Sequence, residues 1–172
     1  MMTDLDETKG KAIEGSLTDK GYKVKFAYAN VADSASLEAM LKVAVTTFGR
    51  IDFAVNCAGV TGAQALVHEI SEADFKEIIT VDLEGTWRFS KLMITYWRSL
   101  EPRLVRHDEG EHFGAVYQRG SLVNVASSLG SEGKEYLGVY CAAKHGVIGL
   151  SKTLALENAE MGIRVNTVSP GE

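Results

Sequence analysis

Two residues that can move a proton, Tyr140 and Lys144, stand four positions apart in the segment Y-C-A-A-K. On an α-helix this spacing places both side chains on one face. A free tyrosine has a pKa of about 10, and a neighbouring ammonium group favours the phenolate form. Tyr140 is therefore a candidate general acid or base, assisted by Lys144. The same spacing arises by chance in many helices, so the pair needs support from other positions.

A third polar group, Ser127, follows the run V-N-V-A, which is typical of a strand. A hydroxyl at the carboxyl end of a strand can donate a hydrogen bond to a substrate carbonyl oxygen while Tyr140 protonates it. The competing interpretation is an ordinary Ser-Ser turn with Gly130. Upstream, the segment N-C-A-G at residues 56–59 ends another strand. Its small residues allow a ligand to approach the backbone, although a plain strand-to-loop turn is the alternative.

Short β-rich runs alternate with longer segments of helical periodicity along the chain. Strands are expected at residues 22–28, 51–55, 121–125 and 163–168. Helices are expected at residues 6–20, 34–48 and 140–161, and a long helix opens at Ser71 and bends at Gly85. This alternation without hairpin signals predicts parallel βαβ units and an α/β fold with a doubly wound parallel sheet. Such sheets bind ligands at the carboxyl ends of their strands.

The composition is that of a soluble globular protein. Of 172 residues, 45% are hydrophobic, and 18 basic residues against 23 acidic ones give a net charge of −5. This charge offers no surface for nucleic acid or anionic lipid. No stretch approaches the roughly 18 apolar residues of a membrane span, so no membrane partner is expected. With two cysteines, Cys57 and Cys141, the simpler interpretation is reduced thiols in a cytoplasmic protein.

Four segments together resemble the short-chain dehydrogenase/reductase family. They are N-C-A-G at residues 56–59, G-S-L-V-N-V-A-S-S at 120–128, Y-C-A-A-K at 140–144 and I-R-V-N-T-V-S-P-G at 163–171. Their order and spacing match jointly, and the resemblance covers almost the whole chain. It implies a Rossmann-like fold and an NAD(P)-dependent oxidoreductase. Such an enzyme interconverts an alcohol and a carbonyl of a small-molecule substrate by hydride transfer.

The resemblance also implies a role for each matching residue. Ser127 would orient the substrate oxygen, Tyr140 would transfer the proton, and Lys144 would assist the tyrosine and hold the nicotinamide ribose. The cofactor, NAD or NADP, would further contact residues near several strand ends: Asp4, Asn30, Val31, Asn56, Ala58, Gly59, Pro170 and Gly171. Asp4 matches an acidic residue that binds ribose hydroxyls, and its carboxylate would repel a 2′-phosphate and favour NAD. A helix N-terminal charge is the alternative role for Asp4.

Two features depart from the family pattern. Asp82, in the segment V-D-L, stands where the family usually has Asn in its catalytic set. An ionised Asp adds a charge near Lys144 and cannot donate a hydrogen bond. The family's glycine-rich turn T-G-x-x-x-G-x-G, whose N–H groups hold the pyrophosphate, is not found in this sequence. We therefore expect residues 1–172 to form a single partial domain, incomplete at both ends, in which strand 22–28 lacks a neighbour.

A second hypothesis follows from the missing turn. The chain could be a catalytically inactive interaction module that pairs with relatives through its long helices. By resemblance, the helix that opens at Ser71 and the helix of Tyr140 would form the contact of a homo-oligomer. The smooth Ala/Gly face of the second helix suits close approach, while core packing within one chain is the competing role.

Residues 101–120 are rich in charge and poor in apolar side chains. This composition predicts an exposed loop of about twenty residues, and loops of that length are often functional or mobile. The loop contains His107 and His112. A metal site needs more converging ligands than these two, so no metal is expected.

Overall fold

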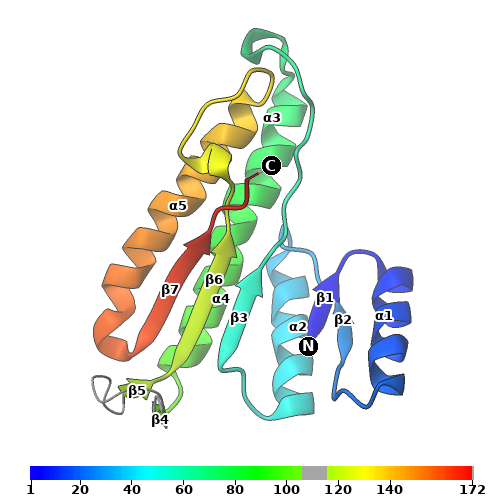
Figure 1. Ribbon diagram of the computed structural model, residues 1–172, viewed down its shortest axis with the longest axis vertical. Helices are drawn as coiled ribbons and strands as arrows, with labels where there is room; N and C mark the ends of the chain where they lie inside the picture. The colour runs from blue at the N-terminus through cyan, green and yellow to red at the C-terminus, as the bar shows by residue number, and fades with distance from the viewer. Residues whose placement is uncertain (106–115, 172) are drawn as a thin grey trace. The chain divides into compact units, whose positions relative to one another are not determined.

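A computed structural model describes residues 1–105 and 116–171. The chain divides into two compact units, Met1–Ile51 and Asp52–Glu172, and each is described here by itself. Figure 1 shows the course of the chain through both units. In each unit, parallel strands are connected by helices, so the predicted α/β class is confirmed.

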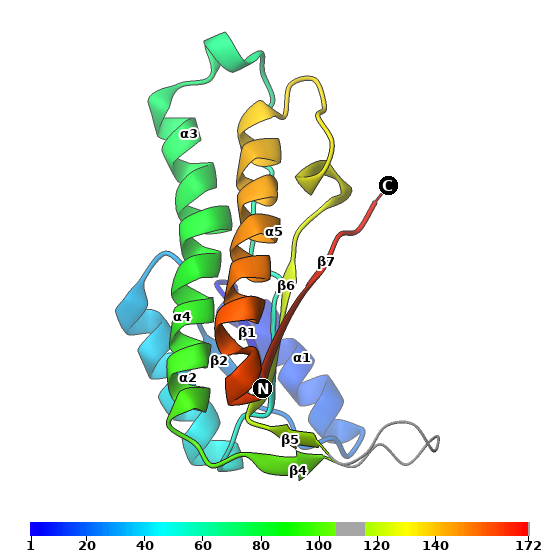
Figure 2. The ribbon, with the colours of Figure 1, turned by 90° about the vertical axis from the view of Figure 1, so that its left-hand side faces the viewer.

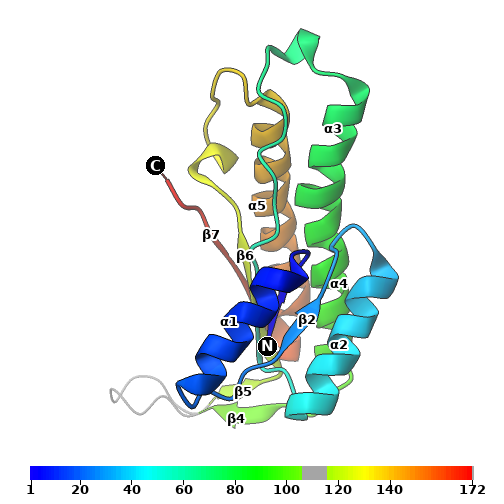
Figure 3. The same ribbon diagram turned by 90° about the vertical axis from the view of Figure 1, so that its right-hand side faces the viewer.

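The first unit is a βαβ arrangement followed by a second helix. Strand β1 (Met2–Asp4) and strand β2 (Phe26–Tyr28) pair in parallel, and helix α1 (Glu7–Asp19) connects them. Figure 3 shows α1 and helix α2 (Ser34–Phe48) on either side of this strand pair. The expectation that strand 22–28 lacks a neighbour is therefore wrong, because β1 is its partner. The strand is shorter than predicted since β1 offers three residues for pairing.

Acidic side chains fix where both helices of the first unit begin. The Asp6 carboxylate accepts a hydrogen bond from the Lys9 backbone N–H at 2.9 Å, and Asp33 caps α2 through the Ala35 N–H. The Lys9 N–H holds the pKa of Asp6 below its ordinary value of 3.8, and the Lys9 ammonium adds to this effect. At the other end of α2, Gly49 has a φ of 81°, which glycine adopts without steric cost.

The second unit is built on a three-stranded parallel sheet in the order β3-β6-β7. These strands are β3 (Phe53–Asn56), β6 (Gly120–Val125) and β7 (Ile163–Val168). Asn56 is aligned with Asn124 across the first pair, and Asn124 is aligned with Thr167 across the second. The carboxyl ends of all three strands therefore meet at one edge of the sheet, as the parallel arrangement predicts.

Two long helices lie side by side on one face of this sheet, as Figure 2 shows. They are α4 (Gly85–Arg98) and α5 (Gly138–Asn158), and the short helix η4 (Ala159–Met161) continues α5 toward β7. Asn124, near the carboxyl end of the central strand β6, is fully buried and holds both helices. Its Nδ2 donates to Ser151 Oγ of α5 at 2.9 Å and to Ser90 Oγ of α4 at 3.3 Å.

The helix predicted from Ser71 onward consists of three parts. Ser71 caps α3 (Glu72–Ile78) through the Asp74 N–H, as its position predicts, and follows the short helix η1 (Val67–Glu69). A π-helical turn, η2 (Ile79–Glu84), then leads into α4 at Gly85. The sequence predicts an interruption of the helix at Gly85, and the structure has a π-helical turn that ends directly before this residue. Such turns are rare and are often found at functional sites.

The exposed loop predicted at residues 101–120 contains two short strands instead. Strand β4 (Arg103–Val105) and strand β5 (Val116–Gln118) pair in antiparallel register. This pairing satisfies backbone groups that a loop would leave to water. Residues 106–115, which include His107 and His112, lie outside the described part of the chain.

Trp97 of α4 packs against the backbone of β6 at Gly120, and its side chain is 0% exposed. Replacing Gly120 by alanine should destabilise the second unit, because the added methyl group would overlap the Trp97 ring. Overpacking of this kind lowers the free energy of unfolding by about 1–3 kcal/mol. Urea denaturation followed by tryptophan fluorescence measures the change.

Gly133→Ala is the matched control, because a Cβ at Gly133 would have no neighbouring atom within 4 Å. Its free energy of unfolding should stay within about 0.5 kcal/mol of the unsubstituted protein. Equal values for the two variants would contradict the packing described for Gly120.

Candidate active site

A cavity of about 330 Å³ opens where β3, β6 and β7 end. Three predicted catalytic residues contribute to its wall: Ser127, Tyr140 and Lys144. The rest of the wall consists of Cys57, Gly59, Val60, Thr61, Val125, Ala126, Pro170 and Gly171. Residues from the ends of three strands and from the first turns of α5 thus surround one space.

Ser127 follows β6 and caps the short helix η3 (Ser128–Gly130). Its Oγ accepts a hydrogen bond from the Leu129 backbone N–H at 3.2 Å. This bond uses the oxygen as an acceptor, so the hydroxyl can still donate its proton to an oxygen in the cavity. The Ser-Ser turn considered as an alternative is present, and it leaves the hydroxyl usable.

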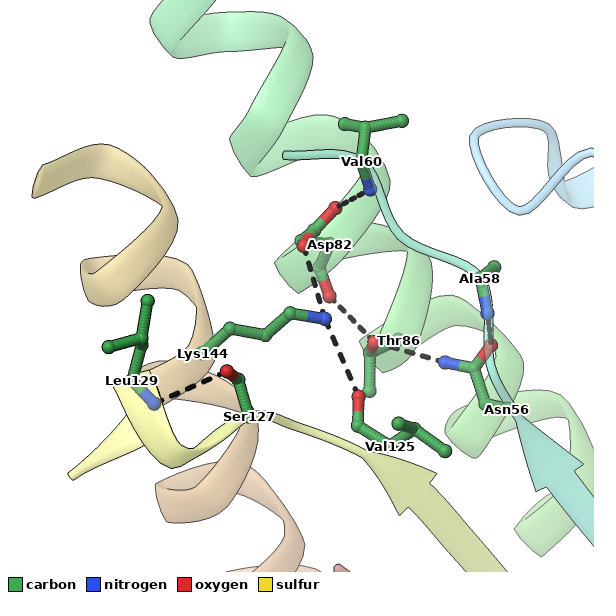
Figure 4. Close-up of polar contacts among 9 residues, drawn as sticks. All are labelled: Asn56, Ala58, Val60, Asp82, Thr86, Val125, Ser127, Leu129 and Lys144. Atoms are coloured by element: carbon green, nitrogen blue, oxygen red, sulfur yellow. Dashed lines mark hydrogen bonds and ion pairs between the residues drawn. The ribbon is translucent and has the colours of Figure 1, made fainter. Parts of the chain in front are cut away.

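The Lys144 ammonium and the Asp82 carboxylate form a buried ion pair (Figure 4). Nζ lies 3.2 Å from Asp82 Oδ2, and the two side chains are 6% and 0% exposed. Asp82 Oδ1 accepts a hydrogen bond from the Val60 N–H at 2.8 Å, and Lys144 Nζ donates to the Val125 carbonyl oxygen at 3.5 Å. The pair therefore connects η2, α5, the segment after β3 and the end of β6.

Hydrogen bonds around the π-helical turn hold Asp82 in place. Thr86 Oγ1 donates to the Asp82 carbonyl oxygen at 2.6 Å, and Asn56 Nδ2 donates to Thr86 Oγ1 at 3.0 Å. Asn56 Oδ1 in turn accepts from the Ala58 N–H at 3.3 Å. Asn56 is buried, and neither it nor Ala58 contributes to the described cavity wall. Their place in the structure is to attach the end of β3 to η2.

Tyr140 lies one helical turn before Lys144 on α5, and its side chain is half-buried at the cavity wall. Lys144 Nζ is 5.3 Å from the centre of the phenol ring. Tyr140, Lys144 and Ser127 thus border one cavity, with the ammonium near the phenol ring.

Gly59 passes close to the ion pair. A Cβ at this position would lie 3.1 Å from Lys144 Nζ and 3.4 Å from Asp82 Oδ2. A larger residue would press on both charged groups. Glycine here also leaves the backbone of the N-C-A-G segment open to the cavity, which agrees with the expectation of close approach by a ligand.

Three predicted cofactor residues, Asp4, Asn30 and Val31, lie in the first unit and are described within it. Asp4 ends β1, and its Oδ1 accepts a hydrogen bond from the Asp6 N–H at 2.9 Å. Asn30 follows β2, and its Oδ1 accepts from the Ala32 N–H at 2.9 Å. Because β1 and β2 are parallel neighbours, these residues lie at the same end of the strand pair.

Several residues of the site escaped the sequence analysis. Val60 and Val125 act through backbone groups, which no residue type signals. Thr86 carried a weak signal, because a threonine four residues after Asp82 on a helix can donate to its carbonyl oxygen. Cys57 was considered for its thiol, and the structure places it exposed at the cavity wall, whereas Cys141 is buried.

Residues 1–105 and 116–171 contain no group of three His, Cys, Asp or Glu side chains that could hold a metal ion. Within the same residues, no helix is both long and apolar enough to cross a lipid bilayer.

The whole chain, residues 1–172, matches the sequence model of the short chain dehydrogenase family. The chain belongs to this family. Its relatives include 3-hydroxyacyl-CoA dehydrogenase type-2 of Rattus norvegicus, 35% identical over 170 residues that cover 96% of this chain and 58% of the relative. The 3-oxoacyl-[acyl-carrier-protein] reductase FabG of Haemophilus influenzae is also 35% identical, and the match covers 98% of this chain and 61% of the relative.

Solved structures of short chain dehydrogenases have the same Rossmann-like fold. One from Mycobacterium smegmatis has a TM-score of 0.84 at 29% identity, covering 98% of this chain and 64% of that one. NAD⁺-bound xylitol dehydrogenase has a TM-score of 0.80 at 28% identity, and the match covers 98% of this chain and 58% of that one. ElxO, solved with NADP bound, has a TM-score of 0.81 at 29% identity, and the match covers 98% of this chain and 61% of that one. The chain spans 53% to 62% of the length of the curated relatives that it matches.

Replacing Lys144 by methionine should destabilise the second unit, because it leaves the Asp82 carboxylate buried without its ion-pair partner. Removing one member of a buried pair costs about 3–5 kcal/mol. Urea denaturation at pH 7.5 measures the change in the free energy of unfolding.

Lys152→Met is the matched control, since Lys152 lies on the same helix with its side chain exposed. We expect a change in the free energy of unfolding within about 0.5 kcal/mol. A Lys144→Met variant as stable as this control would show that the ion pair contributes little.

Proposed function

We propose that this chain is the catalytic part of an NAD(P)-dependent oxidoreductase that interconverts an alcohol and a carbonyl in a small-molecule substrate. The observation that carries the proposal is the convergence of Ser127, Tyr140 and Lys144 on one cavity at the strand ends. Membership of the short chain dehydrogenase family supports it. So do the reactions named by its relatives, a hydroxyacyl dehydrogenase and an oxoacyl reductase.

The proposed chemistry divides between the cofactor and three side chains. When bound, the nicotinamide accepts a hydride from the substrate carbon or returns one to it. During alcohol oxidation, Tyr140 in its phenolate form takes the proton of the substrate hydroxyl, and in the reverse direction it gives that proton back. Ser127 donates a hydrogen bond to the substrate oxygen and keeps it beside Tyr140. The Lys144 ammonium stabilises the phenolate electrostatically.

The residues that line the cavity suit the nicotinamide end of the cofactor. Lys144 presents an ammonium that can donate to ribose hydroxyls, and Gly59 and Gly171 expose backbone without side chains. Pro170 and Gly171 would lie beside the nicotinamide. NAD and NADP are both found in solved structures of similar proteins. The preference for NAD over NADP, which the sequence predicts from Asp4, stays a prediction.

Tyr140→Phe tests the proposal, because it removes the hydroxyl and keeps the ring. Turnover should fall by about 100-fold to 10,000-fold, which is the usual contribution of a general acid or base. Binding of the cofactor should change little. The absorbance of NAD(P)H during oxidation of a panel of small alcohols, together with calorimetric titration of the cofactor, measures both quantities.

Tyr136→Phe is the control, since Tyr136 lies in the loop directly before α5 and its side chain is 52% exposed. It should retain full turnover. Retained turnover in Tyr140→Phe would refute the role assigned to Tyr140. A protein that binds neither NAD nor NADP would instead favour the competing hypothesis of an inactive interaction module.

We also propose that the protein forms a homo-oligomer through α4 and α5. Trp87 of α4 is 46% exposed, and Gly149 of α5 has no atom near the position of a Cβ. Trp87→Glu should therefore lower the molar mass measured by light scattering to that of a single chain. Tyr22→Glu, at an exposed position of the first unit, should leave the mass unchanged. A protein that is monomeric without substitution would refute this proposal.

The cytoplasmic location that the sequence predicts stays a prediction.

A further inference from the structure

Behind the cavity wall lies a buried charge, the Asp82 carboxylate, to which the proposed chemistry assigns no step. The proposed proton transfer uses the Tyr140 hydroxyl and the Lys144 ammonium. The Asp82 carboxylate neither gives nor takes a proton in it, although it offsets part of the charge that the ammonium presents to the phenolate. Yet Asp82 is completely buried and lies 3.2 Å from the ammonium. Lys144 alone would present one positive charge to the cavity, while the pair together is neutral.

A second carboxylate on the same turn, that of Glu84, has a basic partner of its own. Glu84, on the same π-helical turn as Asp82, forms an ion pair with Arg88 at 2.7 Å, and its side chain is 47% exposed. Tyr140, on the same helix, and Cys57, at the cavity wall, are titratable groups that border the same cavity as Lys144. Asp82 is thus the carboxylate that contacts the ammonium.

We propose that Asp82 sets the redox preference of the nicotinamide site by neutralising Lys144. The oxidised nicotinamide ring carries a positive charge and the reduced ring is neutral. An uncompensated ammonium would repel the oxidised form and leave the reduced form unaffected, and partly buried charges are screened only weakly. Asp82 therefore favours binding of the oxidised cofactor. This inference rests on the proposed function for the place of the nicotinamide beside Lys144. Asp82 acts through Lys144 and is a positioning residue.

Asp82→Asn removes the charge and keeps the shape of the side chain. Its single acceptor oxygen can serve the Val60 N–H or Lys144 Nζ, but not both, so the double variant described below completes the test. The quantity to measure is the ratio of two dissociation constants, that of NAD⁺ divided by that of NADH, by calorimetric titration at low ionic strength. NADP⁺ and NADPH take their place if that pair binds more tightly. We expect the ratio to rise at least threefold in the variant.

Glu84→Gln is the matched control. It removes the same charge from the same turn, but from a side chain that is partly exposed and paired with Arg88. The ratio should stay within the error of the measurement. An equal rise in both variants would mean that net charge, and not the contact with Lys144, determines the preference, and would overturn the inference.

A charge-restoring variant separates the effect of charge from loss of structure. Lys144→Met leaves the carboxylate alone and should lower the ratio, whereas the double variant Asp82→Asn/Lys144→Met is again neutral and should return it to the original value. Contacts that both cofactor forms lose with Lys144 cancel in the ratio. Should Asp82→Asn fail to fold, the comparison of Lys144→Met with the double variant carries the same test.

Two further results would overturn the inference. Binding of both cofactor forms with an unchanged ratio in Asp82→Asn would refute it and leave the proposed function standing. Failure of the unsubstituted protein to bind either form of either cofactor would refute the proposed function and this inference together.

Discussion

A buried carboxylate and a buried ammonium can stay charged inside a protein only when each compensates the other. In this chain Asp82 and Lys144 meet that condition, and much of the second unit is arranged around them. The π-helical turn η2 directs Asp82 inward, the Val60 N–H holds its second oxygen, and Gly59 leaves the space that the pair occupies. The wall of the cavity is thus formed by the same contacts that keep the two charges together.

A second buried polar group, the Asn124 amide, holds the helices α4 and α5 on the sheet. Asn124 on the central strand donates to a serine of α4 and a serine of α5. An amide buried without partners would be costly, so these bonds favour one position for both helices. The position of α5 in turn determines where Tyr140 and Lys144 enter the cavity. Polar contacts deep in the unit and the chemistry at its edge therefore depend on each other.

The convergence of Ser127, Tyr140 and Lys144 on one cavity could be predicted because it depends on local features of the sequence. Tyr140 and Lys144 share a helix face through their spacing, and Ser127 ends a strand that any parallel sheet brings to the ligand edge. The partner of Lys144 is a different case, since it depends on how η2 packs against α5. Strand β1 has three residues, too few for a periodic pattern, so the partner of β2 was missed. The β4–β5 pair was not predicted, because its side chains are mostly exposed and show no alternation of apolar and polar residues.

The positions of the two cysteine thiols give the protein a built-in reporter. Cys57 is exposed at the wall of the cavity, whereas Cys141 is buried in α5. A bulky thiol-specific reagent therefore meets one accessible sulfur in the folded chain, beside the segment where a ligand approaches the backbone. The rate of its reaction would slow whenever a small molecule fills that space. Ligands could thus be screened by mass spectrometry before any substrate is known and without a catalytic assay.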